Sequence, residues 1–579
     1  MAIKYTNPYG SANFNSFNED KVAFVDKTNF IEVIDKLDTK YPILLRPRRF
    51  GKTTFVQMLD YFYDISKKDQ YDEVFRGTKI HEMNLPSHNT YHVLNLEFSE
   101  IYGNTSAQLV EGFTSNIIDS IADFLDRYPE VNFEVDEYKN KTPSTLINAF
   151  FTSCKIAFKG KQDLYVIIDE YDNFANEILS KDRKLFKEIT NANGFLKAFY
   201  KAIKKHTNTV VAKTFITGVS SVSLDSLTSG FNIAKNVTCD PRLNEFAGFT
   251  KDELIGLIEK LVDTKALNTT AENIAEIMRQ AYNGYAFCPE AKHTLFNSSM
   301  CLNYIDYISL KKTIENPERV LDPACAFDKS KVADIISFTP KNVLKLVASE
   351  FETTGEIVIS ELAQSINLNQ LEQYDLQTSL SVLYYLGYLT IKNNGVGSGI
   401  CLTYPNKMMK YMFELCFINV LIPKLEDDEN CIFDITSMLR GEPDLKGFID
   451  SVTEYLSLRI TNQHLLGFNE NTIKVLVRAK LEDLKMLSVN TEQKLTVPMV
   501  GEKFADLVVD NQKGTYYLFE FKYFSKAKAQ QQPSILQEKI AEATEQINCY
   551  KKALEFEGKT LYSYIAIFES INCVHFEQV

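Results

Sequence analysis

Residues 45–54 read Leu-Arg-Pro-Arg-Arg-Phe-Gly-Lys-Thr-Thr and lie between a short apolar run and an amphipathic pattern. The apolar run, residues 41–45, predicts a buried strand, and apolar residues from Phe55 to Phe62 follow at helical spacing. A loop in this context directs backbone N–H groups and a helix N-terminus toward phosphate. The stretch therefore predicts a phosphate-binding loop (P-loop) in an α/β domain.

Within this loop we expect Lys52 to reach the β- and γ-phosphates of ATP and the Thr53 hydroxyl to hold Mg²⁺. The usual pattern GxxxxGK[ST] has a glycine where this sequence has Arg46. Arg46, Arg48 and Arg49 add positive charge to the loop. They could bind phosphate, act across a subunit boundary or pair with acidic neighbours, and the sequence leaves the three alternatives open.

Residues 164–170, Leu-Tyr-Val-Ile-Ile-Asp-Glu, form an apolar strand that ends in two carboxylates. We expect Asp169 to complete the Mg²⁺ shell and Glu170 to polarise the attacking water. A buried strand with a solvated acidic end is the alternative. Thr217, at the end of the next apolar strand, could sense the γ-phosphate. The residues assigned to nucleotide binding are Arg46, Arg48, Arg49, Phe50, Gly51, Lys52, Thr53, Thr54, Asp169 and Thr217, with Glu170 as the catalytic carboxylate.

Strands and helices alternate from residue 40 to 220, which predicts a parallel sheet. The predicted strands are residues 41–45, 92–98, 164–168 and 210–217. From residue 251 to about 416 the pattern is mainly helical and ends in a hairpin. This part has a helix at 378–386, strands at 388–392 and 400–403, and a turn at 393–399. It predicts a winged-helix-like module, with a spacer or lid that binds nothing as the alternative.

The last part of the chain has a different order of elements, αβββαβ, which indicates a compact mixed sheet. Its helices are expected at 470–484 and 535–554, and its strands at 494–497, 504–509, 516–522 and 562–568. Glu520 and Lys522 are two residues apart and therefore lie on one face of a strand, with Asp506 on the preceding strand. Two carboxylates and a lysine suit Mg²⁺- or Mn²⁺-assisted phosphodiester cleavage. A surface hairpin with a Glu–Lys pair is the alternative.

Residues 1 to about 300 resemble the AAA-ATPase-like family of bacterial proteins. The matching stretches are residues 24–28, 46–53, 167–172, 215–220, 227–232 and 282–285. In that family Arg-Pro-Arg-Arg commonly replaces the first glycine of the loop. The resemblance implies a P-loop sheet with an additional strand (the ASCE type) and Glu170 as the catalytic carboxylate.

The C-terminal part resembles the PD-(D/E)XK nuclease superfamily, in the form often fused behind this ATPase family, and residues 386–390 and 404–406 match the same fusion. The resemblance implies Asp506, Glu520 and Lys522 as catalytic residues, and Asp506, Glu520 and Glu470 as metal ligands. Gln546 and Tyr550 match a Gln-xxx-Tyr feature that could contact nucleic-acid phosphate. Both could equally be ordinary surface or packing residues of a helix.

Composition and charge agree with a globular protein of several domains. The expected domains are 1–250 (P-loop), 251–310 (helical lid), 311–430 (helical, winged-helix-like) and 431–579 (nuclease). A net charge of −13 excludes a broadly basic nucleic-acid coat. The ten cysteines form no CxxC pair. No signal peptide and no membrane-length apolar run is visible, so we expect a cytoplasmic protein.

Together these patterns predict an ATP-regulated, Mg²⁺-dependent nuclease that acts on DNA more than on RNA. One alternative is a nucleotide-gated signalling or scaffold switch whose nuclease-like domain only binds nucleic acid or a protein partner. Another is a P-loop that binds ATP without hydrolysing it. A homo-oligomer is expected by analogy, because P-loop ATPases of this group often complete their sites between subunits.

Overall fold

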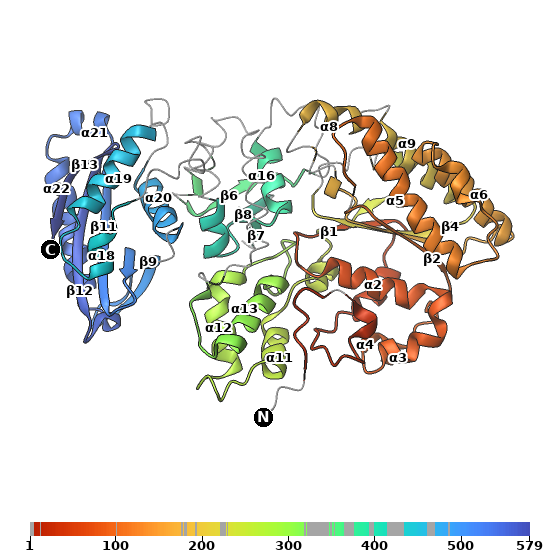
Figure 1. Ribbon diagram of the computed structural model, residues 1–579, viewed down its shortest axis with the longest axis horizontal. Coiled ribbons are helices and arrows are strands. Elements are labelled where there is room, and N and C mark those ends of the chain that lie inside the picture. Colours follow the sequence, from red (N-terminus) through yellow and green to blue (C-terminus); the bar gives the residue numbers. More distant parts are fainter. Residues whose placement is uncertain are drawn as a thin grey trace. The chain divides into compact units, whose positions relative to one another are not determined.

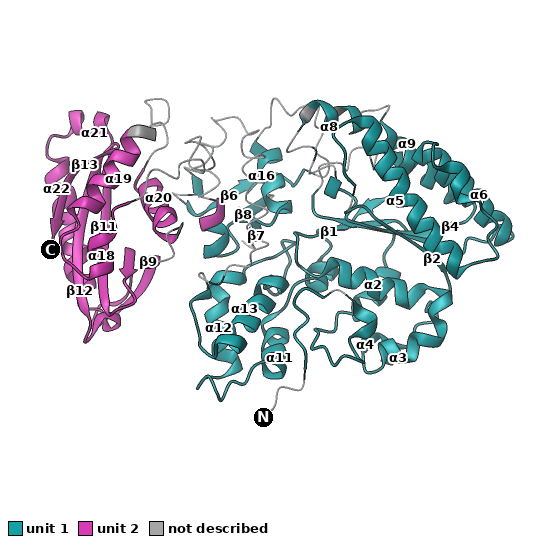
Figure 2. Cartoon of the chain, in the orientation of Figure 1, with its two compact units in different colours: residues 1–410 teal, residues 411–579 magenta. Residues whose placement is uncertain are grey.

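The structure is a computed structural model in which the chain forms two compact units, residues 1–410 and 411–579 (Figure 2). It describes residues 5–579 except 12, 100, 175–177, 179–181, 191–193, 221–226, 228–229, 318–319, 321–346, 348–349, 352–353, 364–375, 393–398, 414–432, 460–468 and 484–486. The domain boundary expected near residue 430 and most of the turn expected at 393–399 lie outside the described residues. Each unit is described by itself.

Unit 1 is built on a five-stranded parallel sheet with the order β2-β3-β4-β1-β5. The strands are β1 (Pro42–Leu45), β2 (His92–Glu97), β3 (Leu164–Asp169), β4 (Val211–Gly218) and β5 (Lys235–Asn236). Every residue of β1 and β3 is buried, because helices cover both faces of a parallel sheet. The four strands predicted from the sequence are confirmed, and the short edge strand β5 was not predicted.

The position of β4 in this sheet decides the type of P-loop fold. β4 lies between β1, which leads into the P-loop, and β3, which ends at Asp169. The expected additional-strand sheet is therefore confirmed. Ligand sites of open parallel sheets lie at the carboxyl ends of the strands, where β1, β3 and β4 end side by side.

Helices pack on both sides of this sheet (Figure 1). One side carries α2 (Lys52–Tyr63) and the other α5 (Ser106–Arg127), α6 (Pro143–Ala157) and α9 (Phe195–His206). Smaller elements of this region are η1 (Phe14–Ser16), α1 (Asn29–Asp35), η2 (Ile65–Gln70), α3 (Tyr71–Phe75), α4 (Lys79–Met83), η3 (Val135–Tyr138), α8 (Arg183–Thr190) and η4 (Pro241–Phe246). Threonine caps begin α5 and α6, and Pro143 occupies the first turn of α6, which is where proline is tolerated in a helix.

The rest of unit 1 consists of a helical lid and a small sheet. The lid helices are α11 (Lys251–Leu261), α12 (Ala271–Tyr282) and α13 (Ser298–Lys311). After them come α16 (Leu376–Tyr385) and an antiparallel sheet of order β6-β8-β7, formed by β6 (Glu356–Ile359), β7 (Thr390–Lys392) and β8 (Ile400–Thr403). The predicted helix and hairpin strands are confirmed, and β6 is an addition.

Unit 2 is a mixed five-stranded sheet of order β13-β12-β11-β10-β9. Its strands are β9 (Ser488–Val497), β10 (Gly501–Asp510), β11 (Thr515–Phe524), β12 (Thr560–Glu569) and β13 (Asn572–Gln578). Its helices are α18 (Thr436–Arg440), α19 (Lys446–Arg459), α20 (Glu470–Asp483), α21 (Lys526–Gln531) and α22 (Ile535–Tyr550), with η7 (Leu554–Phe556). The predicted αβββαβ order is confirmed, and β13 is a further strand that the sequence analysis missed.

No helix in the described part of the chain combines the length and the apolar character that crossing a bilayer requires.

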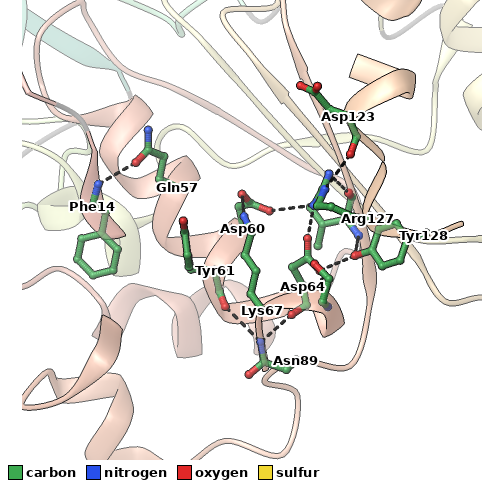
Figure 3. Close-up of polar contacts among 12 residues, drawn as sticks. Phe14, Gln57, Asp60, Tyr61, Asp64, Lys67, Asn89, Asp123, Arg127 and Tyr128 are labelled. Atoms are coloured by element: carbon green, nitrogen blue, oxygen red, sulfur yellow. Dashed lines mark hydrogen bonds and ion pairs between the residues drawn. The ribbon is translucent and has the colours of Figure 1, made fainter. Parts of the chain in front are cut away.

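A buried polar network fixes the end of α2 that is remote from the P-loop (Figure 3). The fully buried Asp64 carboxylate accepts hydrogen bonds from the backbone N–H and hydroxyl of Ser66 (2.7 and 2.6 Å) and from the Tyr128 hydroxyl. It also forms an ion pair with Arg127, whose guanidinium donates to the Val93 carbonyl of β2 (3.0 Å). The network therefore ties α2 to α5 and to the sheet.

Replacing Asp64 by alanine should lower the free energy of unfolding of unit 1 by about 3 kcal/mol, because a half-buried cation and three other donors lose their acceptor. Urea unfolding followed by circular dichroism measures the change. Asp123→Ala is the matched control: Asp123 is exposed and contacts Arg127 only through its backbone carbonyl. The control should change stability by less than about 0.5 kcal/mol. Equal effects of the two substitutions would contradict this role.

Candidate functional site

The P-loop of unit 1 turns into α2 at Gly51. This residue has a φ of 92°, in the left-handed region that glycine adopts at the lowest cost. The turn makes Lys52 the first residue of α2, and its buried ammonium donates to the carbonyls of Arg46 (3.1 Å) and Pro47 (3.2 Å). Lys52 therefore lies over the loop, beside the free N–H groups of the first helical turn. An ammonium and a helix N-terminus together favour a bound phosphate.

The carboxylates at the end of β3 meet this lysine. The Lys52 ammonium lies 3.7 Å from Oε1 of Glu170, and Asp169 accepts a hydrogen bond from the Glu170 N–H (2.9 Å). Burial and the adjacent charge of Glu170 raise the pKa of Asp169 to about 7, whereas Lys52 and a hydrogen bond from Thr53 oppose the rise. The predicted residues Lys52, Thr53, Asp169 and Glu170 thus come together. Hydroxyl and carboxylate oxygens are the donor set that Mg²⁺ prefers.

Thr217 is the last residue but one of β4, directly beside β1. It is buried and pairs with Leu44, to whose carbonyl its hydroxyl donates (2.8 Å). Thr217 therefore lies near the carboxyl end of β4, with its hydroxyl proton directed to the strand that carries the loop, and its role as a sensor stays a prediction.

Asp172 is a buried residue of this site that the sequence analysis did not single out. Its carboxylate accepts hydrogen bonds from the backbone N–H of Val219 (3.0 Å) and from the N–H and hydroxyl of Ser220 (2.7 and 2.8 Å). A Cβ on Gly218 would lie 2.4 Å from Asp172 Oδ1, so the glycine permits this approach. Asp172 therefore fixes the chain immediately after β4. Its only sequence signal was its place at the end of the matching stretch 167–172.

Arg46 has a structural environment that none of the three expected roles describes. Its side chain is 1% exposed, and the guanidinium donates to the carbonyls of Leu45 (2.8 Å), Thr238 (2.9 Å) and Leu243 (2.6 Å). The guanidinium also stacks on the ring of Phe287, 4.1 Å from the ring centroid. Burial lowers the pKa of Arg46 to about 10. Arg46 thus joins the P-loop to the chain that follows β5 and to the lid.

Replacing Arg46 by lysine should destabilise unit 1 by about 2 kcal/mol, although the positive charge is kept. A lysine cannot donate in the planar fork that reaches separate carbonyls while it stacks on an aromatic ring. Thermal unfolding of the full chain provides the measurement. Arg242→Lys is the matched control, since Arg242 is half-exposed and pairs with Asp240 at the surface. An unchanged melting temperature for Arg46→Lys would show that its contacts contribute little.

The remaining loop residues are held largely by the lid. Arg48 donates to the Asn173 side-chain oxygen, and Arg49 has a φ of 69° and accepts at its carbonyl from the Ser299 N–H (3.2 Å). The Phe50 carbonyl accepts from the Gly248 N–H (3.0 Å), while the Phe50 ring packs edge-on against Tyr285, with centroids 4.9 Å apart. The conformation of the P-loop is therefore coupled to the position of the lid.

A mostly apolar pocket of about 620 Å³, part of it open to solvent, opens beside Gly51 and Thr54. The N-terminal segment, α2 and the lid all contribute to its walls. The residues lining it are Pro8, Ser11, Phe17, Ala23, Phe24, Val25, Lys27, Phe50, Gly51, Thr54, Phe55, Met58, Phe246, Ala247, Gly248, Phe249, Leu257, Ser298 and Leu302. Lys27 is the charged lining residue, and Glu253 binds its ammonium (2.7 and 2.8 Å). An apolar lining beside a loop of this kind is typical of sites that receive the apolar part of a ligand.

Two short motifs of the middle segment pack on the P-loop and the lid helices. Gly387, with a φ of 85°, approaches the loop so closely that a Cβ there would lie 2.9 Å from the Cβ of Pro47. Gly284 of the lid, with a φ of 100°, would place a Cβ only 1.7 Å from the carbonyl oxygen of Pro405. The sequence matches at 386–390 and 404–406 are therefore residues that pack on the loop and the lid.

Two residues of the predicted triplet of unit 2, Glu520 and Lys522, are buried in the middle of the sheet, and Asp506 is half-buried. Glu520 is 2% exposed, and its Oε1 accepts a hydrogen bond from the Lys522 ammonium (2.7 Å). Its other oxygen, Oε2, is buried and has no hydrogen-bond partner among the residues that the structure describes. Burial, followed by the charge of Asp506, raises the pKa of Glu520, while Lys522 opposes the rise. A buried carboxylate oxygen without a partner fits a site for a divalent cation.

Asp506 lies where β10 and β11 separate. The ladder between these strands runs from the pair Asp510–Tyr516 to the pair Leu507–Phe519. Beyond it the Asp506 side chain, through Oδ2, accepts the N–H of Phe521 (2.9 Å). Asp506 therefore reaches β11 beside Glu520, as predicted.

A second lysine, Lys474, completes this cluster and was not predicted. It lies on α20, one turn after Glu470, and its ammonium is 2.8 Å from Asp506 Oδ1 and 3.3 Å from Glu470 Oε1. Glu470 thus faces the site as expected, with Lys474 between it and Asp506. Across the described residues, no three His, Cys, Asp or Glu side chains form a ready metal cage.

Helix α22 covers the same face of the sheet with residues four apart. Glu542 Oε1 lies 3.8 Å from the Lys522 ammonium, and Gln546 Oε1 is buried without a hydrogen-bond partner. Tyr550 is buried in the hydrophobic core of the sheet, and burial together with the charges of Glu520 and Asp506 raises its pKa. Tyr550 therefore lies in the core near Glu520 and Asp506, and Gln546 lies one turn before it on the same helix. Glu542, one turn before Gln546, was missed.

Comparison with known families agrees with both sites. Residues 8–228 match the model described as predicted AAA-ATPase, and residues 469–578 match the model of the PD-(D/E)XK nuclease superfamily. The two resemblances stated from the sequence are confirmed.

Individual relatives are more distant. An uncharacterized protein in the vnfD 5' region of Azotobacter chroococcum mcd 1 is 26% identical over 295 residues, which are 50% of this chain and 50% of that protein. The match thus spans about half of the length of this relative. Among solved structures, the Walker-type ATPase of Pyrococcus abyssi aligns at 13% identity with a TM-score of 0.37, covering 67% of this chain and 94% of that one.

Proposed function

We propose that this chain, which matches predicted AAA-ATPases in one unit and PD-(D/E)XK nucleases in the other, is an ATP-regulated nuclease. Unit 1 would bind and hydrolyse ATP, and unit 2 would cleave phosphodiesters of nucleic acid, DNA in preference to RNA. The observation that carries the proposal is the buried cluster of Asp506, Glu520 and Lys522, in which one carboxylate oxygen has no partner. An ordinary surface hairpin would not bury these groups.

At the ATPase site, Lys52 would hold the terminal phosphates and the lined pocket beside Gly51 would receive the base. Thr53 and Asp169 are the residues that would hold Mg²⁺, and Glu170 would orient the attacking water. A bound Mg²⁺ supplies charge neutralisation to the phosphates. Arg48 and Arg49, which are partly exposed at this loop, would add positive charge near the phosphates.

At the nuclease site, Asp506 and Glu520 would hold the divalent cation, Mg²⁺ or Mn²⁺. Such an ion activates water and stabilises the negative charge on the phosphate. The Lys522 ammonium would orient that water or neutralise the phosphate, and Gln546 would donate to the nucleic-acid backbone.

The regulation we propose starts at the loop. Gly387 packs on Pro47 and Pro405 packs on Gly284, so a change of loop conformation reaches the last residues of unit 1. The small sheet β6-β8-β7 with α16 would act as the winged-helix-like module. By analogy with related ATPases, the protein would work in the cytoplasm as a homo-oligomer, which light scattering with and without ATP tests.

The test is a cleavage assay of the full chain on plasmid, single-stranded DNA and RNA, with Mg²⁺ or Mn²⁺ and with or without ATP. We expect metal-dependent cleavage that changes at least about fivefold with ATP, the lower range of ordinary allosteric coupling, and that Glu520→Ala removes. Absence of cleavage under every condition would refute the proposal.

A second candidate function follows from the contact of Lys474 with Asp506. A lysine on a would-be metal ligand favours a nuclease fold that binds nucleic acid or a protein partner without cutting it. The chain would then be a nucleotide-gated switch. Binding that persists in Asp506→Asn, with no cleavage by the wild type, would favour this candidate.

A further inference from the structure

The cluster in unit 2 contains two lysines, and only one of them belongs to the predicted triplet. Lys474 enters from α20, whereas Lys522 enters from β11. The Lys474 ammonium contacts Asp506 (2.8 Å) and Glu470 (3.3 Å), and its side chain is 15% exposed. Lys474 thus stands between the two carboxylates that the sequence analysis assigned to metal binding.

The carboxylates of the cluster differ in how many of their oxygens are already engaged. Both oxygens of Asp506 are engaged, Oδ1 by Lys474 and Oδ2 by the Phe521 N–H. Glu520 keeps one buried oxygen without a partner. Among the described residues, Glu520 thus has an acceptor left for a cation, whereas the Lys474 ammonium already lies between Asp506 and Glu470.

We propose that the Lys474 ammonium takes the place of a second divalent cation, so that the nuclease site holds a single metal ion. This inference rests on the proposed nuclease function. The ion would be held by Glu520 and Asp506, and Glu470 would hold Lys474 in position instead of binding metal. Lys474 is then a positioning residue for Asp506 and a fixed positive charge beside the scissile phosphate.

Geometry and charge both support this assignment. In two-metal sites the ions lie about 3.5–4 Å apart and share a bridging carboxylate. The Lys474 ammonium takes the place of the second ion in this arrangement. Asp506 would be the bridging carboxylate, in contact with both the ammonium and the metal ion at Glu520. A second divalent ion there would repel the ammonium at contact distance, in a partly buried site where such repulsion is strong. In the described part of the unit, two of the three ammonium protons have carboxylate partners, which leaves one to donate to a phosphate oxygen.

The test counts Mn²⁺ ions bound by the full chain without nucleotide, using electron paramagnetic resonance of free Mn²⁺. Each count is the number of Mn²⁺ ions bound by a protein minus the number bound by the same protein with Asp506→Asn added. Ions bound elsewhere on the chain cancel in this difference. We expect one ion for the wild type and two for Lys474→Met, which keeps the length of the side chain and removes the charge. Lys474→Arg restores the charge and should restore a count of one.

Lys494→Met is the matched control, because Lys494 pairs with Glu502 on an exposed hairpin of the same sheet. It should leave the count at one. Two ions in the wild type, or one ion in both the wild type and Lys474→Met, would overturn the inference while leaving the nuclease proposal intact. No ion in the wild type would refute the proposed function as well. Should Lys474→Met fail to fold, the counts for the wild type and Lys474→Arg still decide between one ion and two.

Discussion

Lys52→Ala is expected to reduce ATP hydrolysis by about 10²–10³-fold, the loss typical of removing one group that stabilises transition-state charge. The ammonium is buried over the loop, 3.7 Å from Glu170, and a water molecule in the resulting gap cannot replace its full positive charge. ATP binding should weaken as well, because Lys52 contacts the phosphates in the ground state too. Phosphate release and equilibrium binding of a fluorescent ATP analogue measure the two effects.

Two further variants separate ATP binding from turnover and control for the loss of a lysine. Glu170→Gln should keep binding and lose turnover, since it removes the group that orients water but leaves Lys52 in place. Lys36→Ala is the control, because Lys36 makes only an exposed pair with Glu32 on α1. Unchanged turnover in Lys52→Ala and Glu170→Gln would discard this site. A wild type that binds ATP without turnover, while Lys52→Ala loses binding, would make the P-loop a binding site only.

Glu520→Ala is expected to lower nucleic-acid cleavage by about 10³-fold, which corresponds to losing several kcal/mol of metal-assisted stabilisation. Asp506→Asn should lower cleavage by a comparable factor, because it removes a metal-binding carboxylate and also disturbs the contact with Lys474. The amide keeps an acceptor for the Phe521 N–H but loses the charge that pairs with Lys474. Single-turnover cleavage of plasmid at saturating Mg²⁺ is the measurement, because it separates the chemical step from product release.

The matched control for these variants is Glu502→Gln. Glu502 lies on β10, the same strand as Asp506, but is exposed and pairs with Lys494. Its cleavage rate and unfolding temperature should equal those of the wild type, and circular dichroism checks that Glu520→Ala and Asp506→Asn are folded. A normal rate in Glu520→Ala would assign the cleavage to other residues or to a contaminating enzyme.

The sheet of unit 1 could be predicted because its strands are short runs of buried Val, Ile and Leu between amphipathic helices. The order of the strands came from the resemblance, since periodicity alone does not say which strands are neighbours. Strand β13 was missed because none of its residues is fully buried: Val574 and Glu577 are exposed, and Cys573 and His575 are half-buried. Such an edge strand carries little hydrophobic signal.

Some polar residues of the two sites could be predicted from the sequence and others could not. Lys52, Asp169, Asp506 and Glu520 have spacing and context that a sequence reveals. The environment of Arg46 was not predictable, because its partners lie nearly 200 residues away. Asp172 and Lys474 gain their roles only when a tertiary contact buries them beside a second strand. A helix pattern gives the position of Lys474 on α20 but says nothing of the carboxylate that it meets.

The contact of Gly284 with Pro405 also bears on the order in which this protein is made. Multidomain chains generally fold unit by unit as they leave the ribosome. Here the lid cannot complete its packing until about 120 further residues have been synthesised, because Asn406 donates to the Asn283 carbonyl across that interval (2.8 Å). Residues after 410 emerge only then. The nascent chain therefore has the segment needed to complete unit 1 before the strands of unit 2 exist, so the nuclease site that we propose cannot form ahead of the unit that we propose controls it.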